Sequence, residues 1–568
     1  MALVGLLFIA PFVVPVHRYP IPSFDVEWIA VVVLATALVV TALGTSARLS
    51  VQWPLPAIAA LLLAIGGAQY LLGMLTYSYS LAALFMFMCA LFAAYLLGRW
   101  LVSVELRDRA LLAVSLALVA GGVLSLVVQL VQALDFRALP DWLVLPMGET
   151  LSKRRPYANI GQPNHLATYF ALATIGALYL TRRGWQRACM LGLVAIFAIG
   201  LALTVSRMGT LFALGLIGLI LTRSALGPES LRERVQFASA IVLGYAVGLV
   251  LTRILLVDPD GVTATALGRY GGTFLQRLSM WTDAVRIAAA HPWLGVGVGE
   301  YGGAQYWAAL PTPALEATNN PHNIVLQIAA EFGWPAAALA VLIVVLWFRG
   351  RVQAWKRDPA VAAALAMILL VLAHAMLEYP LSHLHFLIAV ALLAGVAEPP
   401  GTPAASTGLR TRRVLAPIGV AMICAALVMK IDYDSITPLW ASYLDDIREG
   451  RGHQPETTLG IIASMRSTFF RPQMERLYVE LIPPQAQQGD ENLAMVGRVL
   501  TRLGDVRVIV RYIQLLLQEG RIEETYPHLA RLRVFAGANY PMLRDEILQS
   551  IAANGVELDP LRRKLADP

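Results

Sequence analysis

Long runs of apolar residues separated by short polar stretches dominate the first 430 residues of the chain. They cover residues 2–16, 27–44, 54–74, 80–99, 110–132, 164–181, 187–204, 208–222, 235–255, 322–347, 359–377, 383–398 and 412–430. A helix rises about 1.5 Å per residue, so runs of about 20 residues cross a bilayer. The pattern predicts an all-α polytopic membrane protein with about 12–13 transmembrane helices.

The polar segments between these runs differ in charge. The segments after the fourth, sixth, eighth, tenth and twelfth runs are short and basic; they contain Arg99, Arg107, Arg109, Arg182, Arg183, Arg187, Arg223, Arg232, Arg234, Arg349, Arg351, Lys356, Arg357, Arg410, Arg412 and Arg413. Basic loops stay in the cytoplasm. The other loops, including 133–163 and 256–321, are therefore expected on the opposite side of the membrane, which we take as the periplasm.

The tail after residue 430 is different: charged residues become frequent and apolar ones take helical spacing. This indicates a soluble, periplasmic helical domain, similar to paired tetratricopeptide helices but without a clear repeat period. The expected domains are residues 1–255 (transmembrane), 256–321 (periplasmic loop), 322–430 (transmembrane) and 431–568 (helical tail), with packing or partner docking as the expected role of the tail.

Composition agrees with the membrane class. Hydrophobic residues make up 58% and charged residues 14% of the chain, and the mean hydropathy is +0.64. The net charge of +7 is explained by the basic loops, so we expect no nucleic-acid partner. Cys89, Cys189 and Cys424 lie in apolar runs without metal-ligand spacing and are expected to be small core residues.

The stretch 319–333, NNPHNIVLQIAAEFG, places His322 where a polar segment re-enters an apolar run expected to continue through Trp347. A histidine there is suited to act on a substrate in the membrane, or it is only a polar cap of the helix. Other arginines and histidines gather in loops on the same side: His17, Arg154, Arg155, His165, Arg207, Arg269, Arg277, Arg286, His291, His374 and His383.

These two residue types suit phosphate chemistry. Arginine stays charged and presents a planar fork of donors to phosphate oxygens, and histidine exchanges protons near neutral pH. The expected substrate bears a phosphate or pyrophosphate group and lies at the outward-facing surface of the membrane, as a lipid-linked sugar does. No metal-ligand spacing such as HExxH occurs, and neither a metal nor another cofactor is expected.

Structural alternatives remain for several residues. Arg207 could extend from a helix end, Arg286 and Arg277 could lie on a solvated face, and Arg154 and Arg155 could bind membrane lipid head groups. His165 follows Asn164 where a helix begins and could be a cap, and His374 and His383 are interpreted as structural. The glycines of GVGVG (295–299) follow no strand, so we interpret them as a flexible loop rather than a nucleotide site.

The motifs together resemble the bacterial O-oligosaccharyltransferases of the PglL type, within the wider O-antigen ligase and polymerase superfamily. The resemblance covers about residues 1–400 and rests on PVHRYPIPSFDVEW in the first loop, GQPNHLAT at 161–168, TVSRMG at 204–209, RLSMWTDA at 277–284, HPWLGVGVGEY at 291–301, HNIVL and EFG within 322–333, and HAMLEYPL at 374–381. The HNxxL motif is shared across the superfamily, whereas the first-loop pattern and QPNH are more specific to the protein-glycosylating branch.

The resemblance implies a GT-C-like fold and transfer of a glycan from a polyprenyl diphosphate to a serine or threonine of a periplasmic protein, often a pilin. The superfamily's arginines fall on Arg207 and Arg277, and its essential histidine falls on His322. The candidate substrate-binding residues are Gln162, Asn164, His165, Tyr379, Asn323, His17, Arg154, Arg155 and Arg286.

The implied reaction is an inverting, metal-independent displacement. Arg207 and Arg277 would stabilise the leaving diphosphate, and His322 would either deprotonate the acceptor hydroxyl or bind phosphate as an imidazolium. Three other functions stay open: an O-antigen ligase acting on lipid A-core, an O-antigen polymerase, and a transporter. The one-sided distribution of the polar residues and the lack of paired halves argue against a transporter.

Overall fold

Every regular element in the described part of the chain is a helix, as the apolar runs predict. The computed structural model describes residues 1–44, 51–52, 54–136, 138–146, 155–221, 225–226, 230–256, 270–308, 317–400, 411–450, 460–461, 464–465, 468–481, 489–502 and 504–552. The chain divides into two units: unit 1 comprises 1–59, 87–270 and 342–428, and unit 2 comprises 60–86, 271–341 and 429–568. Each unit is described by itself.

The helices follow the predicted runs closely. In chain order to residue 255 they are α1 (Ala2–Leu6), α2 (Ala10–Val13), α3 (Phe24–Gly44), α4 (Pro54–Leu71), α5 (Ser78–Ser103), α6 (Arg107–Ala133), η2 (Ala158–Ile160), α7 (Pro163–Arg182), α8 (Arg187–Leu203), α9 (Arg207–Leu221) and α10 (Leu231–Leu255). Then come α11 (Tyr270–Ala290), α12 (Tyr301–Ala308), α13 (Ile324–Phe332), α14 (Trp334–Arg349), α15 (Val352–Arg357), α16 (Pro359–Ala375), η3 (Pro380–Ser382), α17 (Leu384–Ala397) and α18 (Thr411–Glu449).

Within the described residues, seven helices are long and apolar enough to cross a membrane, and five shorter apolar helices accompany them. The predicted class, an all-α polytopic membrane protein, is confirmed.

Three predicted runs differ from the observed helices. The run 2–16 contains two short helices, α1 and α2. The run 322–347 is broken at Gly333, whose φ of 90° is one that residues with a Cβ rarely adopt, and Pro335 follows without an N–H to donate. The run 412–430 is the first part of a longer helix, because α18 continues to Glu449 and stops at Gly450, whose φ is 63°.

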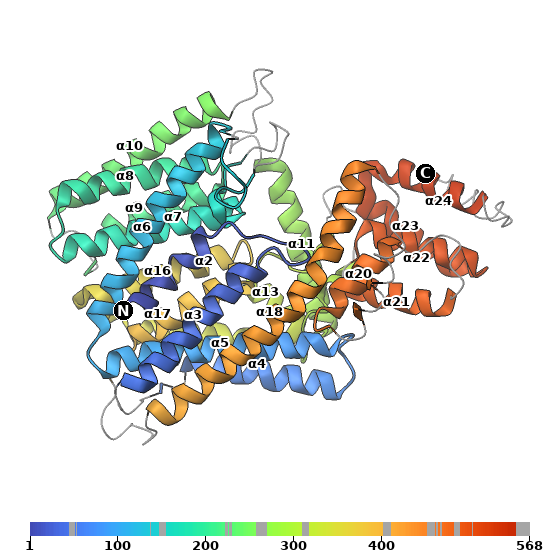
Figure 1. Ribbon diagram of the computed structural model, residues 1–568, viewed down its shortest axis with the longest axis horizontal. Helices are drawn as coiled ribbons and strands as arrows, with labels where there is room; N and C mark the ends of the chain where they lie inside the picture. The colour runs from blue at the N-terminus through green and yellow to red at the C-terminus, as the bar shows by residue number, and fades with distance from the viewer. Residues whose placement is uncertain are drawn as a thin grey trace. The chain divides into compact units, whose positions relative to one another are not determined.

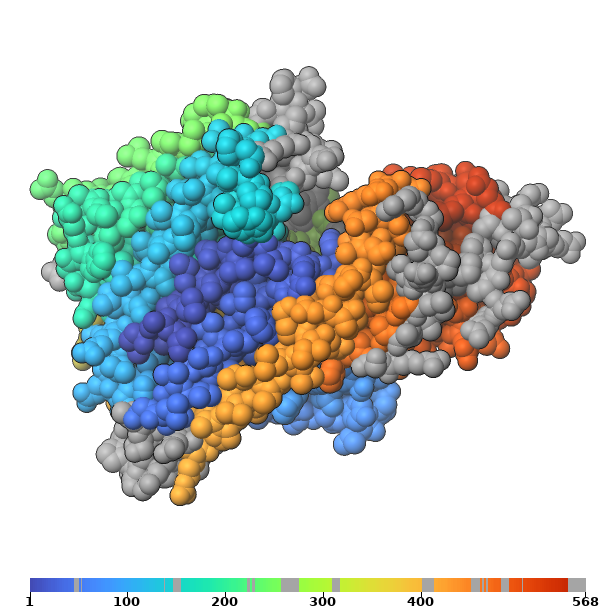
Figure 2. Space-filling model, in the orientation of Figure 1, coloured from blue at the N-terminus to red at the C-terminus, as the bar shows by residue number. Residues whose placement is uncertain are grey.

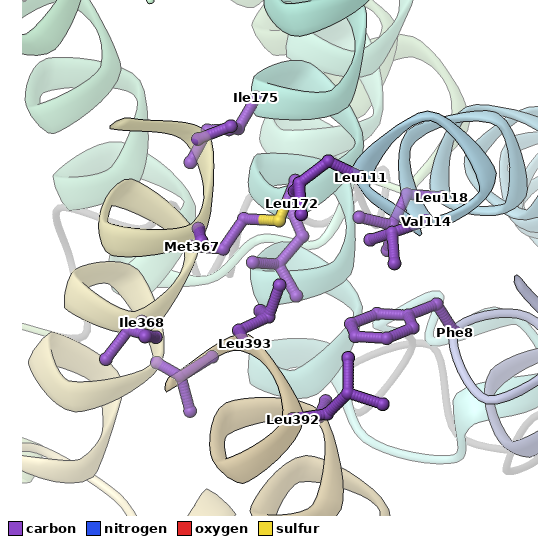
Figure 3. Close-up of a cluster of buried hydrophobic side chains, with 14 of the residues drawn as sticks. Phe8, Leu111, Val114, Leu118, Leu172, Ile175, Met367, Ile368, Leu392 and Leu393 are labelled. Carbon is purple, nitrogen blue, oxygen red and sulfur yellow. The ribbon is translucent and has the colours of Figure 1, made fainter. Parts of the chain in front are cut away.

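The core of unit 1 is built around α7 and α16, whose side chains are buried on nearly all sides. Helix α7 packs against α6, α8, α9 and α16. Figure 3 shows the apolar side chains between these helices, among them Leu172 of α7 and Met367 of α16. Because α7 is enclosed in this way, the start of the helix, where the QPNH motif lies, has a fixed position within unit 1.

Close helix crossings elsewhere in unit 1 depend on small residues. A Cβ on Gly98 of α5 would lie 2.4 Å from the carbonyl oxygen of Leu392 of α17, so only glycine fits. Figure 2 shows the first half of α18 lying along α3 on the surface. There Gly419 lies against Ala35, and the Trp28 indole N–H donates to the Ala426 carbonyl at 2.9 Å.

Unit 2 joins α11–α13 to the tail helices. These are α20 (Arg471–Leu481), α21 (Gly489–Arg502), α22 (Val506–Gln518), α23 (Ile522–Ala536), η5 (Gly537–Asn539) and α24 (Tyr540–Ala552), grouped in Figure 1. Ala284 and Ile287 of α11 pack with Tyr301 of α12 and Ala330 of α13. Tyr306 of α12 is part of the apolar cluster of the tail.

Two predictions about individual residues are wrong. The loop containing Gly295, Gly297 and Gly299 is tightly held rather than flexible: the Val296 and Gly297 N–H groups donate to the carbonyls of Ala330 and Glu331. A Cβ on Gly295 would lie 2.2 Å from the Glu331 carbonyl carbon, so backbone packing requires this glycine. Cys189 and Cys424 are exposed, as expected of small residues on outward-facing sides of membrane helices and not of core residues.

Candidate active site

The candidate site residues divide between the two units. Unit 1 contains His17, Arg155, Gln162, Asn164, His165, Arg207 and Tyr379, and unit 2 contains Arg277, Arg286, His322 and Asn323. Arg154 lies outside the described residues.

The start of α7 explains part of the QPNH motif. Gln162 is the N-cap, and its side-chain oxygen accepts a hydrogen bond from the His165 N–H at 2.6 Å. Pro163 follows at the first helical position, where its missing N–H removes no helical hydrogen bond. The cap is therefore Gln162, and the capping alternative for His165 is wrong.

Asn164 connects three segments of unit 1. Its amide nitrogen donates to Glu378 Oε1 at 2.9 Å, and its side-chain oxygen accepts a hydrogen bond from the Ser206 hydroxyl. Glu378 and Ser206 are both buried. The start of α7, the turn before α9 and the segment after α16 are thus held together by hydrogen-bonded side chains.

This network fixes the neighbours of two candidate residues. Arg207, the first residue of α9, directly follows Ser206, and Tyr379 directly follows Glu378. Arg155 lies at the same turn, with its Nε 3.4 Å from the Thr204 carbonyl oxygen. The Arg155 guanidinium therefore contacts the turn that leads into Arg207, and two arginines near one short turn suit the binding of phosphate oxygens.

A group of histidine rings lies beside this network. The His165 ring centroid is 4.9 Å from that of His383 and 5.4 Å from that of His374. His374 Nδ1 is 2.7 Å from the Thr168 hydroxyl, and His383 Nδ1 is 3.1 Å from Glu27 Oε1. These contacts agree with a structural role for His374 and His383.

His17 is attached to the segment that precedes α7. Its Nε2 is 2.9 Å from the Asn159 carbonyl oxygen, and its ring lies against Gly161, where a Cβ would come within 2.9 Å. Burial lowers the pKa of His17 below its usual value, despite the opposing effect of the Asn159 contact. The His17 ring therefore packs against the turn that leads to Gln162.

The Asn164–Glu378 hydrogen bond gives a testable prediction. Glu378→Ala removes the acceptor of the partly buried Asn164 amide, which costs about 1 kcal/mol for a hydrogen bond of this kind. We expect thermal unfolding in detergent micelles to occur at a lower temperature than for the wild type. Glu378→Gln keeps a side-chain oxygen at the same position and should unfold close to the wild-type temperature. Equal unfolding temperatures for Glu378→Ala and the wild type would contradict this role.

In unit 2, His322 lies at the end of a short hydrogen-bonded segment. Thr318 Oγ1 donates to the Asn320 carbonyl and accepts from its N–H, and Asn320 Oδ1 accepts from the His322 N–H at 2.7 Å. Asn323 caps α13, because its side-chain oxygen accepts from the N–H groups of Val325 and Leu326. Asn323 is therefore the helix cap, and the capping alternative for His322 is wrong.

The backbone of His322 is in the left-handed region, with φ of 55°. For a residue with a Cβ this conformation costs roughly 1–2 kcal/mol. The Asn320 hydrogen bond and the adjacent Asn323 cap maintain it. Strained backbone of this kind is frequent where a side chain must point in a defined direction at a functional site.

Helix α11 carries Arg277 and Arg286. Arg286 is exposed and lies 3.8 Å from the Asp283 carboxylate, a weak ion pair. Asp283 is buried, and burial raises its pKa to about 6, opposed by a hydrogen bond from Gln305 and by the charge of Arg286. Arg277 lies nearly two helical turns before Asp283 and is partly buried.

Four residues that hold the candidates in place were not predicted as site residues from the sequence: Ser206, Glu378, Gln305 and Asn320. Ser206 and Glu378 directly precede Arg207 and Tyr379, so their position in the motifs was an available signal. Gln305 is an isolated glutamine in a short helix, and nothing in the sequence around it indicates its contacts.

Comparison with known proteins gives three family matches. Residues 191–341 match the O-antigen ligase family, residues 362–545 match the family described as virulence factor membrane-bound polymerase, C-terminal, and residues 156–180 match the protein glycosylation ligase family. The last range includes Gln162, Asn164 and His165, and the first includes Arg207, Arg277 and His322.

A curated relative is similar over most of the chain. A general O-oligosaccharyltransferase of Acinetobacter baylyi is 25% identical over 483 residues, covering 82% of this chain and 81% of the relative. No solved structure matches the chain. The resemblance to the O-oligosaccharyltransferases of the O-antigen ligase superfamily is thus confirmed, and the chain is an enzyme of the glycosyltransferase type.

Proposed function

We propose that this enzyme transfers a glycan from a polyprenyl diphosphate, such as undecaprenyl diphosphate, to serine or threonine hydroxyls of periplasmic proteins such as pilin. The observation that carries the proposal is the geometry of His322. A histidine held in a strained conformation by Asn320, directly before a capped helix, is a preorganised group for proton transfer or phosphate binding.

The proposed reaction is a single displacement. The acceptor oxygen attacks the anomeric carbon, the bond between that carbon and the diphosphate oxygen breaks, and its electron pair leaves with the polyprenyl diphosphate. His322 takes the hydroxyl proton, and Arg207 and Arg277 stabilise the negative charge that grows on the leaving oxygen. The configuration at the anomeric carbon is inverted, and the arginines supply the positive charge that a metal ion supplies in other transferases.

Further residues are assigned to substrate binding. We propose that Arg155, beside the turn of Arg207, and Arg286 of α11 attract the diphosphate. The residues that we propose for substrate binding are Tyr379, Gln162, Asn164, His165, Asn323 and His17. Arg154 belongs to the same proposal. The short basic loops favour a bacterial inner-membrane location, with these residues and the C-terminal helices on the periplasmic side.

Purified enzyme in detergent, a polyprenyl diphosphate glycan and a pilin-type acceptor test the proposal, with EDTA present throughout. We expect intact-mass spectrometry to show the acceptor gaining the mass of one glycan. A parallel reaction with lipid A-core, and one with donor alone, test the ligase and polymerase functions. Transfer only to lipid A-core would show that the enzyme is an O-antigen ligase. Growth of the lipid-linked glycan alone would show that it is a polymerase. Loss of transfer in EDTA would contradict the metal-independent mechanism.

A further inference from the structure

Gln305 is a buried glutamine, 1% exposed, in the eight-residue helix α12 of unit 2. Its side-chain oxygen accepts a hydrogen bond from the Thr318 N–H at 3.0 Å. This hydrogen bond ties the segment that begins at Thr318 to α12. Gln305 also lies near enough to the buried Asp283 carboxylate of α11 to oppose the rise in the pKa of that group.

The segment and the helix joined in this way each lead to a candidate catalytic residue. On one side, Thr318 bonds to Asn320 through its hydroxyl, and Asn320 accepts the hydrogen bond from the His322 N–H. On the other side, α12 is bonded to α11, the helix that carries Arg277, because the Tyr301 hydroxyl donates to the Met280 carbonyl at 3.2 Å. Gln305 therefore holds the segment of His322 to a helix that is itself attached to the helix of Arg277.

The helix that carries Gln305 is itself held firmly. The Tyr301 hydroxyl donates to the Met280 carbonyl of α11 at 3.2 Å, and the Tyr306 hydroxyl is 2.6 Å from His528 Nδ1 in the tail. A Cβ on Gly303 would lie 1.9 Å from the Thr501 carbonyl oxygen, so α12 lies directly against α21. Arg531 donates to the Tyr306 carbonyl and stacks on the Trp307 ring.

We propose that Gln305 is a positioning residue for glycan transfer, which sets the place of the His322 segment relative to α11. The C-terminal helices act through it, because they fix α12. This inference rests on the proposed function for its effect on rate. Misplacement of a reacting group by about 1 Å can cost about 100-fold in rate, so loss of the link lowers kcat more than it changes either KM.

Two substitutions test the hydrogen bond to Thr318. Gln305→Ala removes the acceptor, and we expect kcat to fall by about 10- to 100-fold with the KM values for donor and acceptor within about twofold of wild type. Gln305→Glu keeps a side-chain oxygen as the acceptor for Thr318 but places a second carboxylate near Asp283. We expect its kcat to recover as the pH is lowered, because protonation of one of the two carboxylates removes their repulsion. Gln514→Ala, which removes a buried glutamine of the tail, is the matched control and should leave kcat unchanged.

Hydrogen exchange of the full-length protein tests the link without using activity. In Gln305→Ala we expect faster exchange of the amides of Thr318, Asn320 and His322, and in Gln305→Glu the Thr318 amide should stay protected. Unchanged exchange in Gln305→Ala, or a kcat within twofold of wild type, would overturn the inference while wild-type transfer still supports the proposed function. If the wild type transfers no glycan, the proposed function fails and the exchange result alone decides whether Gln305 holds the segment.

Discussion

Glycan transfer is expected to fall by about 10²- to 10⁴-fold when His322 is replaced by alanine, the usual contribution of a positioned proton-transfer group. Which kinetic constant changes, kcat or the KM for the donor, distinguishes the two roles left open for this side chain. A base acts in the transition state, so its removal lowers kcat. A phosphate ligand binds the donor in the ground state, so its removal raises the KM for the donor. Initial rates at varied donor and acceptor concentrations measure both constants.

His291→Ala is the matched control for this measurement. His291 is an exposed histidine of the same unit, directly after α11. Its replacement should leave kcat and KM near their wild-type values. Equal losses for the two histidine variants, or wild-type transfer by His322→Ala, would remove His322 from the mechanism.

The second large effect concerns the two arginines. Arg207→Ala and Arg277→Ala are each expected to lower kcat by about 10²- to 10³-fold, the range measured when one preorganised group that stabilises transition-state charge is removed. Lysine at either position keeps the charge but loses the planar fork of donors, so Arg207→Lys and Arg277→Lys should recover only part of the rate. Single-turnover rates with saturating donor isolate this step from product release.

Arg253→Ala provides the comparison, since Arg253 is an exposed arginine in the last turn of α10. It should transfer glycan at the wild-type rate. Full recovery by both lysine variants would show that point charge alone is sufficient. A rise in the KM for the donor without a loss in kcat would assign the arginines to donor binding in the ground state.

The helical architecture could be predicted because a bilayer imposes it. A run of about 20 apolar residues must satisfy its backbone hydrogen bonds internally, and a helix does so. The boundaries of α6 and α7 accordingly lie close to the ends of the predicted runs. The break at Gly333 could not be predicted in this way, because apolar residues continue on both sides of it.

The residue types of the site could also be predicted, but not the contacts that hold them. Arg207 and His322 were identifiable from their chemistry and their motifs. The Asn164–Glu378 hydrogen bond joins residues 214 positions apart, and the Gln305–Thr318 hydrogen bond depends on a helix with no distinctive sequence. Such contacts are set by tertiary packing, which the order of residues along the chain does not display.

The packing of Tyr306 within the apolar cluster of the tail has a practical meaning for mapping the topology of this protein. Reporter enzymes are commonly fused to chains truncated at successive loops. A fusion point after α12 but before residue 489 removes α21–α24 and leaves Gly303 and Tyr306 of α12 without the helices that cover them. Reporters inserted into the complete chain avoid this loss, and they can report sidedness and glycan transfer from the same molecule.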